Sequence, residues 1–286
     1  MRQVSIGVCC ISVALALSAC SGGDQSDKDV ARAMKDVDVI DDANLQDVML
    51  TMGDPNEAVN YFTVATQKNP ERIDMQRGLA TSLIRAKRTT EGASAWQKVV
   101  GMEGSTNDDK VELADAMIRD NRWDEAEQAL ATIPPTHETF KRYRLEAMIA
   151  DSHKDWKKAD SFYEIAVGLT TTPANVMNNW GFSKLSRGDY KGAEKLFMEA
   201  LQRDGSMFTA KNNLVLARAA QRNYELPIIQ MSQSERAELL YTMGLSAIKQ
   251  GDIRTGRALL QNAVDTHPQH FEAAVNALAA LDSQQG

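Results

Sequence analysis

Cysteine is confined to the first 20 residues of this 286-residue chain, where it stands at Cys9, Cys10 and Cys20. No disulfide can therefore cross-link the residues that follow, even in an oxidising compartment. Packing between side chains alone has to hold the fold.

Residues arranged for catalysis or metal binding are also missing. There is no glycine-rich phosphate loop and no His-Glu-x-x-His pair. Among the four histidines, only His267 and His270 lie close together, and Pro268 ends a helix between them. A solvated connection between helices explains this pair better than a metal site does. We therefore predict no enzymatic activity, no cofactor and no metal ion.

Positive charge is outnumbered along the chain. Lysine and arginine total 32 against 39 aspartate and glutamate residues, so the formal net charge is −7 at pH 7. Nucleic-acid-binding domains carry the opposite balance, with basic residues gathered on one face. We therefore expect no nucleic-acid partner.

The apolar run over residues 4–19 is too short to cross a membrane, because a spanning helix needs about 20 apolar residues. With Arg2 before it, the run has the form of a secretory signal. It ends in Leu17-Ser18-Ala19-Cys20, which resembles a bacterial lipobox. The resemblance implies removal of a lipoprotein signal peptide, residues 1–19, and lipidation of Cys20. The alternative is an ordinary secretory signal with a chance cysteine.

A lipidated Cys20 determines the expected location of the protein. Each buried methylene of an acyl chain contributes about 0.8 kcal/mol, so several chains would hold the protein to a membrane permanently. Ser21 stands where lipoproteins retained in the inner membrane usually have aspartate. We therefore expect a lipid anchor in the outer membrane, on its periplasmic face. Residues 20–38 are polar and charged, and we expect them to form the lipidated N-terminus and a flexible tether.

A repeat of about 34 residues organises the rest of the chain. Its small residues are spaced 34, 34, 33 and 34 apart, at Ala58, Gly92, Ala126, Ala159 and Ala193. This is the period of the tetratricopeptide repeat, a pair of antiparallel helices whose axes come nearest at a small residue. We therefore predict an all-α fold, a tetratricopeptide-repeat superhelical solenoid, with five repeats over residues 39–207.

Larger side chains follow the same period. Four residues after each small residue a bulky side chain should fill the groove between repeats, at Phe62, Trp96, Leu130, Tyr163 and Phe197. Pro70 and Pro268 should end second helices. In the first helices we expect Trp180, beside Gly181, to pack inward, together with the residues at equivalent positions, Leu45, Leu79, Leu113 and Leu214.

The sixth repeat is predicted to be interrupted. Its small residue is due at position 227, where the chain has Pro227, and a proline inside a helix costs about 3 kcal/mol. Residues 208–236 are therefore predicted to form a half repeat and an extended connection, with Ser232 or Ser234 capping the next helix. A C-terminal repeat and a capping helix should complete the solenoid over residues 237–286.

Three segments of the C-terminal half carry a more specific resemblance. They are Asn212-Asn213-Leu214, Leu226-Pro227-Ile228-Ile229, and Ala247-Ile248-Lys249-Gln250-Gly251-Asp252 leading to Thr266-His267-Pro268. Together with the lipobox, the tether and the repeats, they resemble the TadD family, the tetratricopeptide-repeat lipoproteins of the Tad (Flp) pilus assembly system. The resemblance implies a scaffold that supports pilus assembly through contacts with the secretin or with other Tad components.

A second interpretation stays open, an adaptor for outer-membrane barrel assembly or for cell-wall enzymes, as other tetratricopeptide-repeat lipoproteins are. Both interpretations require protein partners, bound on the concave face of the solenoid. By register, this groove includes Arg77, Thr81, Arg85, Arg119, Lys141, Arg144, Asn178, Phe182, Asn212, Leu216 and Tyr241. Several of these are basic, which favours an acidic ligand or a C-terminal carboxylate. The alternative is that they are solvated helix residues.

Two asparagine pairs recur 34 residues apart, Asn178-Asn179 and Asn212-Asn213. Stacked amides can hold the backbone of an extended peptide, because each amide is both a donor and an acceptor. They can instead bond a neighbouring repeat. We expect this structural role for Asn179 and Asn213, and weigh ligand contact against it for Asn178 and Asn212. The sequence leaves open whether residues 226–231 bind a partner or cover the groove.

Overall fold

Helices make up most of the described part of the chain. The computed structural model describes residues 45–51 and 53–283, and these residues contain no β-strand. The all-α fold class is therefore confirmed. The predicted signal peptide, Cys20 and the tether lie outside the described residues. Within the described residues, no helix is both long enough and apolar enough to pass through a bilayer.

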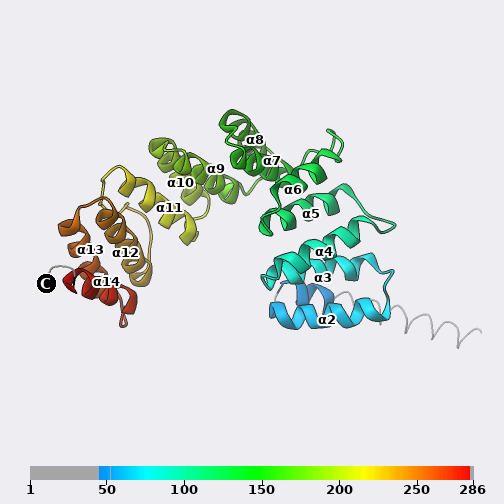
Figure 1. Cartoon of the computed structure of the whole chain (residues 1–286), viewed down its shortest axis with the longest axis horizontal. Helices are drawn as coiled ribbons and strands as arrows, with labels where there is room; N and C mark the ends of the chain where they lie inside the picture. Colours follow the sequence, from blue (N-terminus) through cyan, green and yellow to red (C-terminus); the bar gives the residue numbers. More distant parts are fainter. Residues whose placement is uncertain (1–44, 52, 284–286) are drawn as a thin grey trace, which may run out of the picture.

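Most of the helices form hairpins of a first and a second helix (Figure 1). The first helices are residues 45–51, α3 (Ile73–Arg85), α5 (Asn107–Arg119), α7 (Phe140–Ser152), α9 (Ala174–Ser186) and α12 (Gln233–Lys249). The second helices are α2 (Pro55–Lys68), α4 (Thr89–Val100), α6 (Trp123–Ala131), α8 (Trp156–Gly168), α10 (Tyr190–Arg203) and α13 (Ile253–Thr266). Between α10 and α12, α11 (Phe208–Ala220) is a first helix that has no second helix, and α14 (Glu272–Ser283) follows α13.

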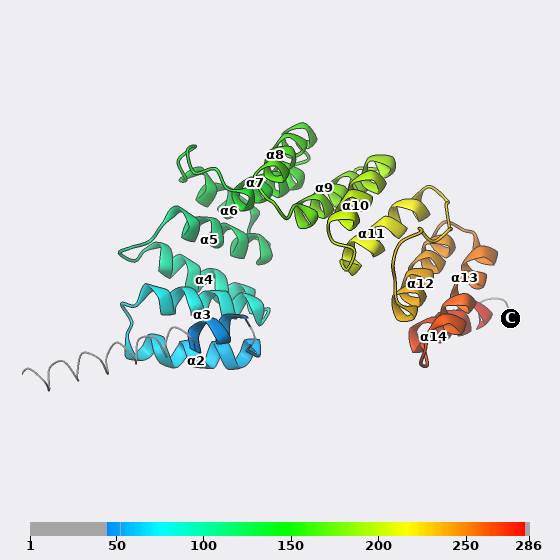
Figure 2. The same ribbon diagram turned by 180° about the vertical axis from the view of Figure 1, so that it is seen from behind.

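The hairpins stack into an arch (Figure 1). α2 to α4 lie at one end of the arch, α12 to α14 at the other, and α7 and α8 near its top. The view from behind shows the same curve (Figure 2). In the middle of the arch, the first helices of successive repeats contact one another: α5 contacts α7, α7 contacts α9, and α9 contacts α11. These helices form a continuous row that positions the site described below.

The core follows the 34-residue period. All five small residues are buried, and so are all five bulky residues four places later, as predicted. A Cβ on Gly181 would lie 2.6 Å from the ring of Phe197, so only glycine lets α9 and α10 approach so closely. Leu113 and Leu214 are buried as expected. Leu45 is 42% exposed, and its core prediction is wrong because it lies on the first described helix, which has no described neighbour on its N-terminal side.

The first helices from α3 onward end in one repeated turn. A residue with left-handed backbone, φ between 59° and 84°, follows each of them: Lys87, Asn121, Lys154, Gly188, Arg222 and Gly251. The amide of the next residue then donates to a carbonyl five residues earlier. Asp189 N–H, for example, donates to the carbonyl oxygen of Lys184 at 2.9 Å. This Schellman turn directs the second helix back along the first. After Arg222 the turn forms, but no second helix follows it.

Residues 221–232 connect α11 to α12 without a helix, and Pro227 is buried among them. Leu226 and Met231 pack against the core shared by α11, α12 and α13. Ile229 packs against the core of α10 and α11. Ile228 is fully exposed. The connection therefore covers apolar surface that a second helix would cover in a complete repeat.

The start of α12 is fastened to α11 by charge. Ser232 is the N-cap: its hydroxyl accepts from the amide of Glu235, and Glu235 Oε2 accepts from the amide of Ser232 at 2.7 Å. Glu235 Oε1 accepts from Nζ of the buried Lys211 at 2.8 Å. These donors, Lys211 foremost, lower the pKa of Glu235. One carboxylate thus joins the two helices on either side of the connection.

Candidate functional site

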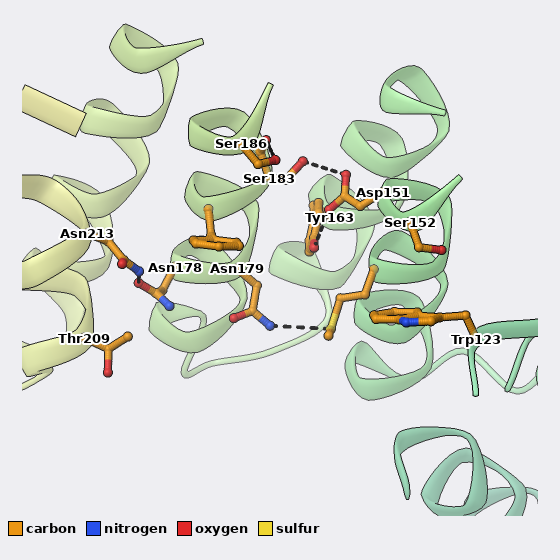
Figure 3. A pocket seen from close by; sticks show the side chains of 12 residues that line it. Trp123, Asp151, Ser152, Tyr163, Asn178, Asn179, Ser183, Ser186, Thr209 and Asn213 are labelled. Atoms are coloured by element: carbon orange, nitrogen blue, oxygen red, sulfur yellow. Dashed lines mark hydrogen bonds between the residues drawn. The ribbon is translucent and has the colours of Figure 1, made fainter. Parts of the chain in front are cut away.

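A hollow of about 470 Å³ opens between α7, α9 and α11 (Figure 3). Its volume lies within the range of natural ligand pockets, roughly 300–1,000 Å³. The residues that line it are Trp123, Met148, Asp151, Ser152, Tyr163, Asn178, Asn179, Phe182, Ser183, Ser186, Thr209 and Asn213.

Helical spacing explains how distant residues reach one hollow. On α7, Met148 lies three residues before Asp151, and on α11 Thr209 lies four residues before Asn213. Residues three and four apart share one face of a helix. The lining residues of α9 follow the same steps from Asn178 through Phe182 to Ser186. Each of the three first helices therefore presents one stripe of side chains to the hollow.

Three large side chains give the hollow an apolar wall. Phe182 is 55% exposed although its neighbours Gly181 and Ser183 are buried, so its ring lies open to a ligand. Met148 lines the hollow from α7, and Trp123 lines it from the start of α6. The indole of Trp123 is held in place because its Nε1–H donates to Oδ1 of Asn121 at 2.9 Å. Aromatic and thioether groups of this kind contact apolar or cationic side chains favourably.

Asp151 is the only carboxylate among the lining residues of the hollow. Its Oδ1 accepts from the hydroxyl of Ser183 at 2.6 Å, and its Oδ2 accepts from the hydroxyl of Tyr163 at 2.9 Å (Figure 3). Burial raises the pKa of Asp151 above its usual value, against the opposing effect of these two donors. Burial and the nearby Asp151 also raise the pKa of Tyr163, so its phenol stays protonated and remains a donor.

The structure separates the four predicted asparagines. Asn213 Nδ2 donates to Asn178 Oδ1 at 3.1 Å, and both side chains are buried at the wall of the hollow. Asn179 also lines the hollow, and its Nδ2 donates to Sδ of Met148 at 3.7 Å. Asn212 lies outside the lining, and its Oδ1 accepts from the hydroxyl of Thr242 at 2.9 Å. The bond between repeats therefore joins Asn178 to Asn213, and Asn179 presents its amide beside Met148.

Arg77 and Arg85, predicted for the groove, fasten neighbouring helices. Arg77 donates through Nε and Nη2 to the two carboxylate oxygens of Asp109, each at 2.7 Å. Burial opposes ionisation of Asp109, but the donors on Arg77 and Thr106 outweigh it and lower the pKa of Asp109. Arg85 donates to backbone carbonyls of the preceding repeat, those of Met49 and Gly53, each at 2.9 Å.

The other predicted cations, Arg119, Lys141 and Arg144, gather around one carboxylate. Asp115 lies 3.4 Å from Arg119, 3.3 Å from Lys141 and 3.7 Å from Arg144. Lys141 also lies 2.6 Å from Glu112. The prediction of a basic groove for a carboxylate ligand counted these cations without their partners. Because α5 supplies both carboxylates, most of this positive charge is compensated within the chain.

The remaining predicted groove residues lie away from the hollow. The ring of Tyr241 packs 5.4 Å from the ring of Phe271, in the core near α14. Thr81 and Leu216 are half-buried on α3 and α11. Of the residues predicted for the groove, the structure therefore gathers only Asn178, Asn179, Phe182 and Asn213 in one hollow.

Sequence reasoning overlooked several members of the site. Met148 lies 34 residues before Phe182, so the repeat period could have identified it. Asp151 carries no such signal, because the residue 34 places later is Leu185. Trp123 begins α6 directly after the turn that ends α5, Tyr163 lies in the core, and each also lines the hollow.

Metal chemistry finds no support in the described residues, which hold no group of three or more His, Cys, Asp and Glu side chains placed for a metal ion. The ring of His267 lies 4.9 Å from the ring of Phe271, and its Nδ1 lies 3.1 Å from the amide nitrogen of Gln269. These contacts give His267 a local role in the turn between α13 and α14.

Comparison with known proteins agrees with this architecture. A family profile described as tetratricopeptide repeat matches residues 241–285. No curated protein matches the chain by sequence. The chain is a tetratricopeptide-repeat solenoid. Its repeats stack into an extended surface, and solenoids of this kind typically serve as scaffolds for protein partners.

Three solved structures illustrate the shared fold. The APC/C hetero-tetramer Cut9-Hcn1 matches with a TM-score of 0.59 and 14% identity, over 82% of this chain and 47% of that one. The human IFIT1 dimer with PPP-AAAA matches with a TM-score of 0.57 and 14% identity, over 81% and 60%. A tetratricopeptide repeat protein from Parabacteroides merdae ATCC 43184 matches with a TM-score of 0.55 and 10% identity, over 82% and 95%. The chain spans about half of the first matched chain, and these identities show the fold alone.

Proposed function

We propose that this protein is a scaffold that binds an extended segment of a partner protein in the hollow between α7, α9 and α11. The exposed ring of Phe182 carries the proposal, because it lies in the hollow instead of in the core. An apolar anchor of this kind supplies binding energy when a partner covers it. The amide of Asn179 and the hydroxyls of Ser152 and Ser186 can bond the backbone of the bound segment.

We further propose that the scaffold is a lipoprotein of the outer membrane that supports assembly of a Tad-type pilus, through contacts with the secretin. The lipobox ending at Cys20 supports the membrane anchor. The resemblance of the segments after residue 211 to the TadD family supports the pilus role. A lipid at Cys20 followed by a polar tether would hold the hollow close to a channel in the same membrane.

Photo-crosslinking in cells tests both levels of the proposal. A photoreactive benzoylphenylalanine replaces Phe182 in the hollow, and in a matched control it replaces Ile165, an exposed apolar residue of the second helix α8. We expect position 182 to capture a partner that position 165 does not capture. Capture of the secretin supports the pilus role. Capture of barrel-assembly or cell-wall proteins would support the adaptor role instead, and equal capture at both positions would contradict a binding role for the hollow.

A further inference from the structure

Asp151 forms no ion pair within the described residues, whereas the nearby Asp160 forms two, and Arg187 acts on Asp151 only from beyond ion-pair distance. Arg187 Nη2 lies 2.6 and 2.8 Å from the two carboxylate oxygens of Asp160. Lys184 Nζ lies 3.6 Å from Asp160 and 3.2 Å from Asp189. Within the described part of the chain, Asp151 takes part in no ion pair, and only hydroxyl groups bond it. The hollow therefore contains a carboxylate that no cation of the described residues contacts directly, because Arg187 bonds Asp160 instead.

The hydroxyls of Ser183 and Tyr163 orient Asp151 without using up its bonding capacity. Each carboxylate oxygen accepts one hydrogen bond, from Ser183 on Oδ1 and from Tyr163 on Oδ2. An ionised carboxylate offers about four acceptor sites, so roughly two remain for a ligand. Ser183 is buried, and Tyr163 is 1% exposed, so both hydroxyls are held firmly by the core. The carboxylate is thus presented to the hollow in one orientation.

The walls of the hollow suit a long side chain with a cationic end. Met148, Phe182 and Trp123 provide apolar surface for an aliphatic stem. The aromatic rings can also attract a cation that lies over their faces. An acidic side chain would be repelled by Asp151, and a purely apolar side chain would cover the carboxylate without pairing it, which is costly. A basic side chain meets both requirements, because its aliphatic stem can pack on the apolar walls and its cationic end can pair with Asp151.

We propose that the hollow receives a lysine or arginine side chain of the bound segment, with its cationic end bonded to Asp151 and its stem lying along Met148 and Phe182. The inference rests on the scaffold function proposed above and specifies the ligand of the same site. It also reverses the charge preference that the sequence indicates, because the cations of the groove are compensated by carboxylates of the chain and Asp151 is not.

Selection from a random peptide library tests the inference. The full-length protein, immobilised in detergent, is panned with a library of twelve-residue peptides displayed on phage. We expect lysine or arginine to be enriched at one position of the selected peptides. In direct binding, Asp151→Asn should weaken these peptides about ten- to hundredfold, as expected for loss of a charged hydrogen bond. The matched control Glu164→Gln removes the same charge from the exposed face of α8 and should leave their affinity unchanged.

A change on the peptide side gives a second test that leaves the protein intact. Replacing the enriched basic residue by norleucine should weaken binding to the wild type by a similar factor, but should have little further effect on Asp151→Asn. Peptides that need Phe182 yet bind Asp151→Asn as tightly as the wild type would overturn the inference and leave the scaffold function standing. Failure to select any peptide that needs Phe182 would overturn both.

Discussion

Asn213 on α11 donates its side-chain amide to Oδ1 of Asn178 on α9 over 3.1 Å, and both side chains are buried. The bond joins neighbouring first helices at the wall of the hollow. Since α11 has no second helix, its position depends on contacts with α9, α10 and α12. The side of the hollow formed by α11 is therefore held by a buried polar bond as well as by apolar packing.

Removing this amide should destabilise the protein. Asn213→Ala leaves Oδ1 of Asn178 buried without a donor, which costs about 1–3 kcal/mol. Asn212→Ala is the matched control on the same helix, where the bond to Thr242 is only partly buried, and it should cost about 0.5–1.5 kcal/mol. Urea unfolding followed by circular dichroism measures both. Equal losses in the two variants would show that the buried pair has no special contribution.

The ion pair between Arg77 and Asp109 should matter far more for stability than the pair between Arg119 and Asp115. Arg77→Met leaves the 5%-exposed carboxylate of Asp109 without its bidentate partner and should cost about 2–3 kcal/mol. Arg119→Met removes a cation that is 50% exposed and should cost at most about 1 kcal/mol. Urea unfolding at pH 7 compares them.

The pH dependence of the Arg77 contribution has a definite sign. Because the folded pKa of Asp109 is lowered, the pair stabilises the fold above the unfolded pKa of aspartate, about 3.9. That stabilisation is lost as the pH falls through the lower folded pKa. The difference between wild type and Arg77→Met should therefore shrink in strong acid, and a difference that grows there would contradict the assignment.

Glycine at position 188 is favoured by its backbone conformation and not by a lack of space. Gly188 has a φ of 84°, and no atom lies within 4 Å of a Cβ added there. Gly188→Ala should therefore destabilise by about 1 kcal/mol through the left-handed backbone alone. Gly168→Ala has the same open space at the end of α8, with no left-handed backbone, and should be neutral or stabilising by up to about 1 kcal/mol. Thermal unfolding distinguishes the two, and equal shifts would contradict a backbone origin.

Asp151→Asn should not destabilise the protein at neutral pH, in contrast with most buried polar substitutions. Burial raises the folded pKa of Asp151, with Asp160 adding to the shift and Arg187 opposing it. An acid whose pKa is raised on folding costs no stability below its unfolded pKa, and the cost appears as the pH rises through its folded pKa. Asp151→Asn should therefore gain stability relative to the wild type between pH 4 and pH 7, roughly the window above the unfolded value. Thermal unfolding over this range tests it; a relative loss toward pH 7 would show that Asp151 is stabilised as an anion.

Loss of the proposed lipid at Cys20 should change the location of the protein without changing its binding site. Cys20→Ser leaves the repeats unchanged and should move the protein from the membrane to the soluble periplasmic fraction, with loss of surface pili. Cell fractionation and electron microscopy of pili measure both. Normal pili made with a soluble protein would contradict a role for the anchor in the proposed function.

The repeat period predicts the core because it requires only one relationship between neighbouring helices. Ala159 and Tyr163 lie where the period places a small and a bulky residue, and both are buried. On α9 the period also gives the face of the helix on which Asn179 and Phe182 line the hollow, whereas Thr81 on α3 and Leu216 on α11 do not line it. These features depend only on the spacing of residues within a repeat, and that spacing can be read from a single sequence.

The charge of the site could not be predicted in the same way. Arg77 pairs with Asp109 in the next repeat, and Arg144 shares Asp115 with Lys141. Such pairs depend on the rotamers of side chains from two repeats, and the period specifies only their helical face. Asp151 is a carboxylate without an ion pair, which the spacing of residues also does not predict. Arg187 and Lys184 pair with Asp160 instead.

The lone helix α11 limits how this solenoid can change length. The hairpins of α3 with α4, α5 with α6, and α7 with α8 each end their first helix in the same left-handed turn. The layer of α11 is different, because residues 221–232 take the place of a second helix and pack on the helices on both sides of it. Repeats gained or lost on the N-terminal side would therefore change the distance from the first described helix, residues 45–51, to the hollow. The distance from the hollow to α12, α13 and α14 would stay constant.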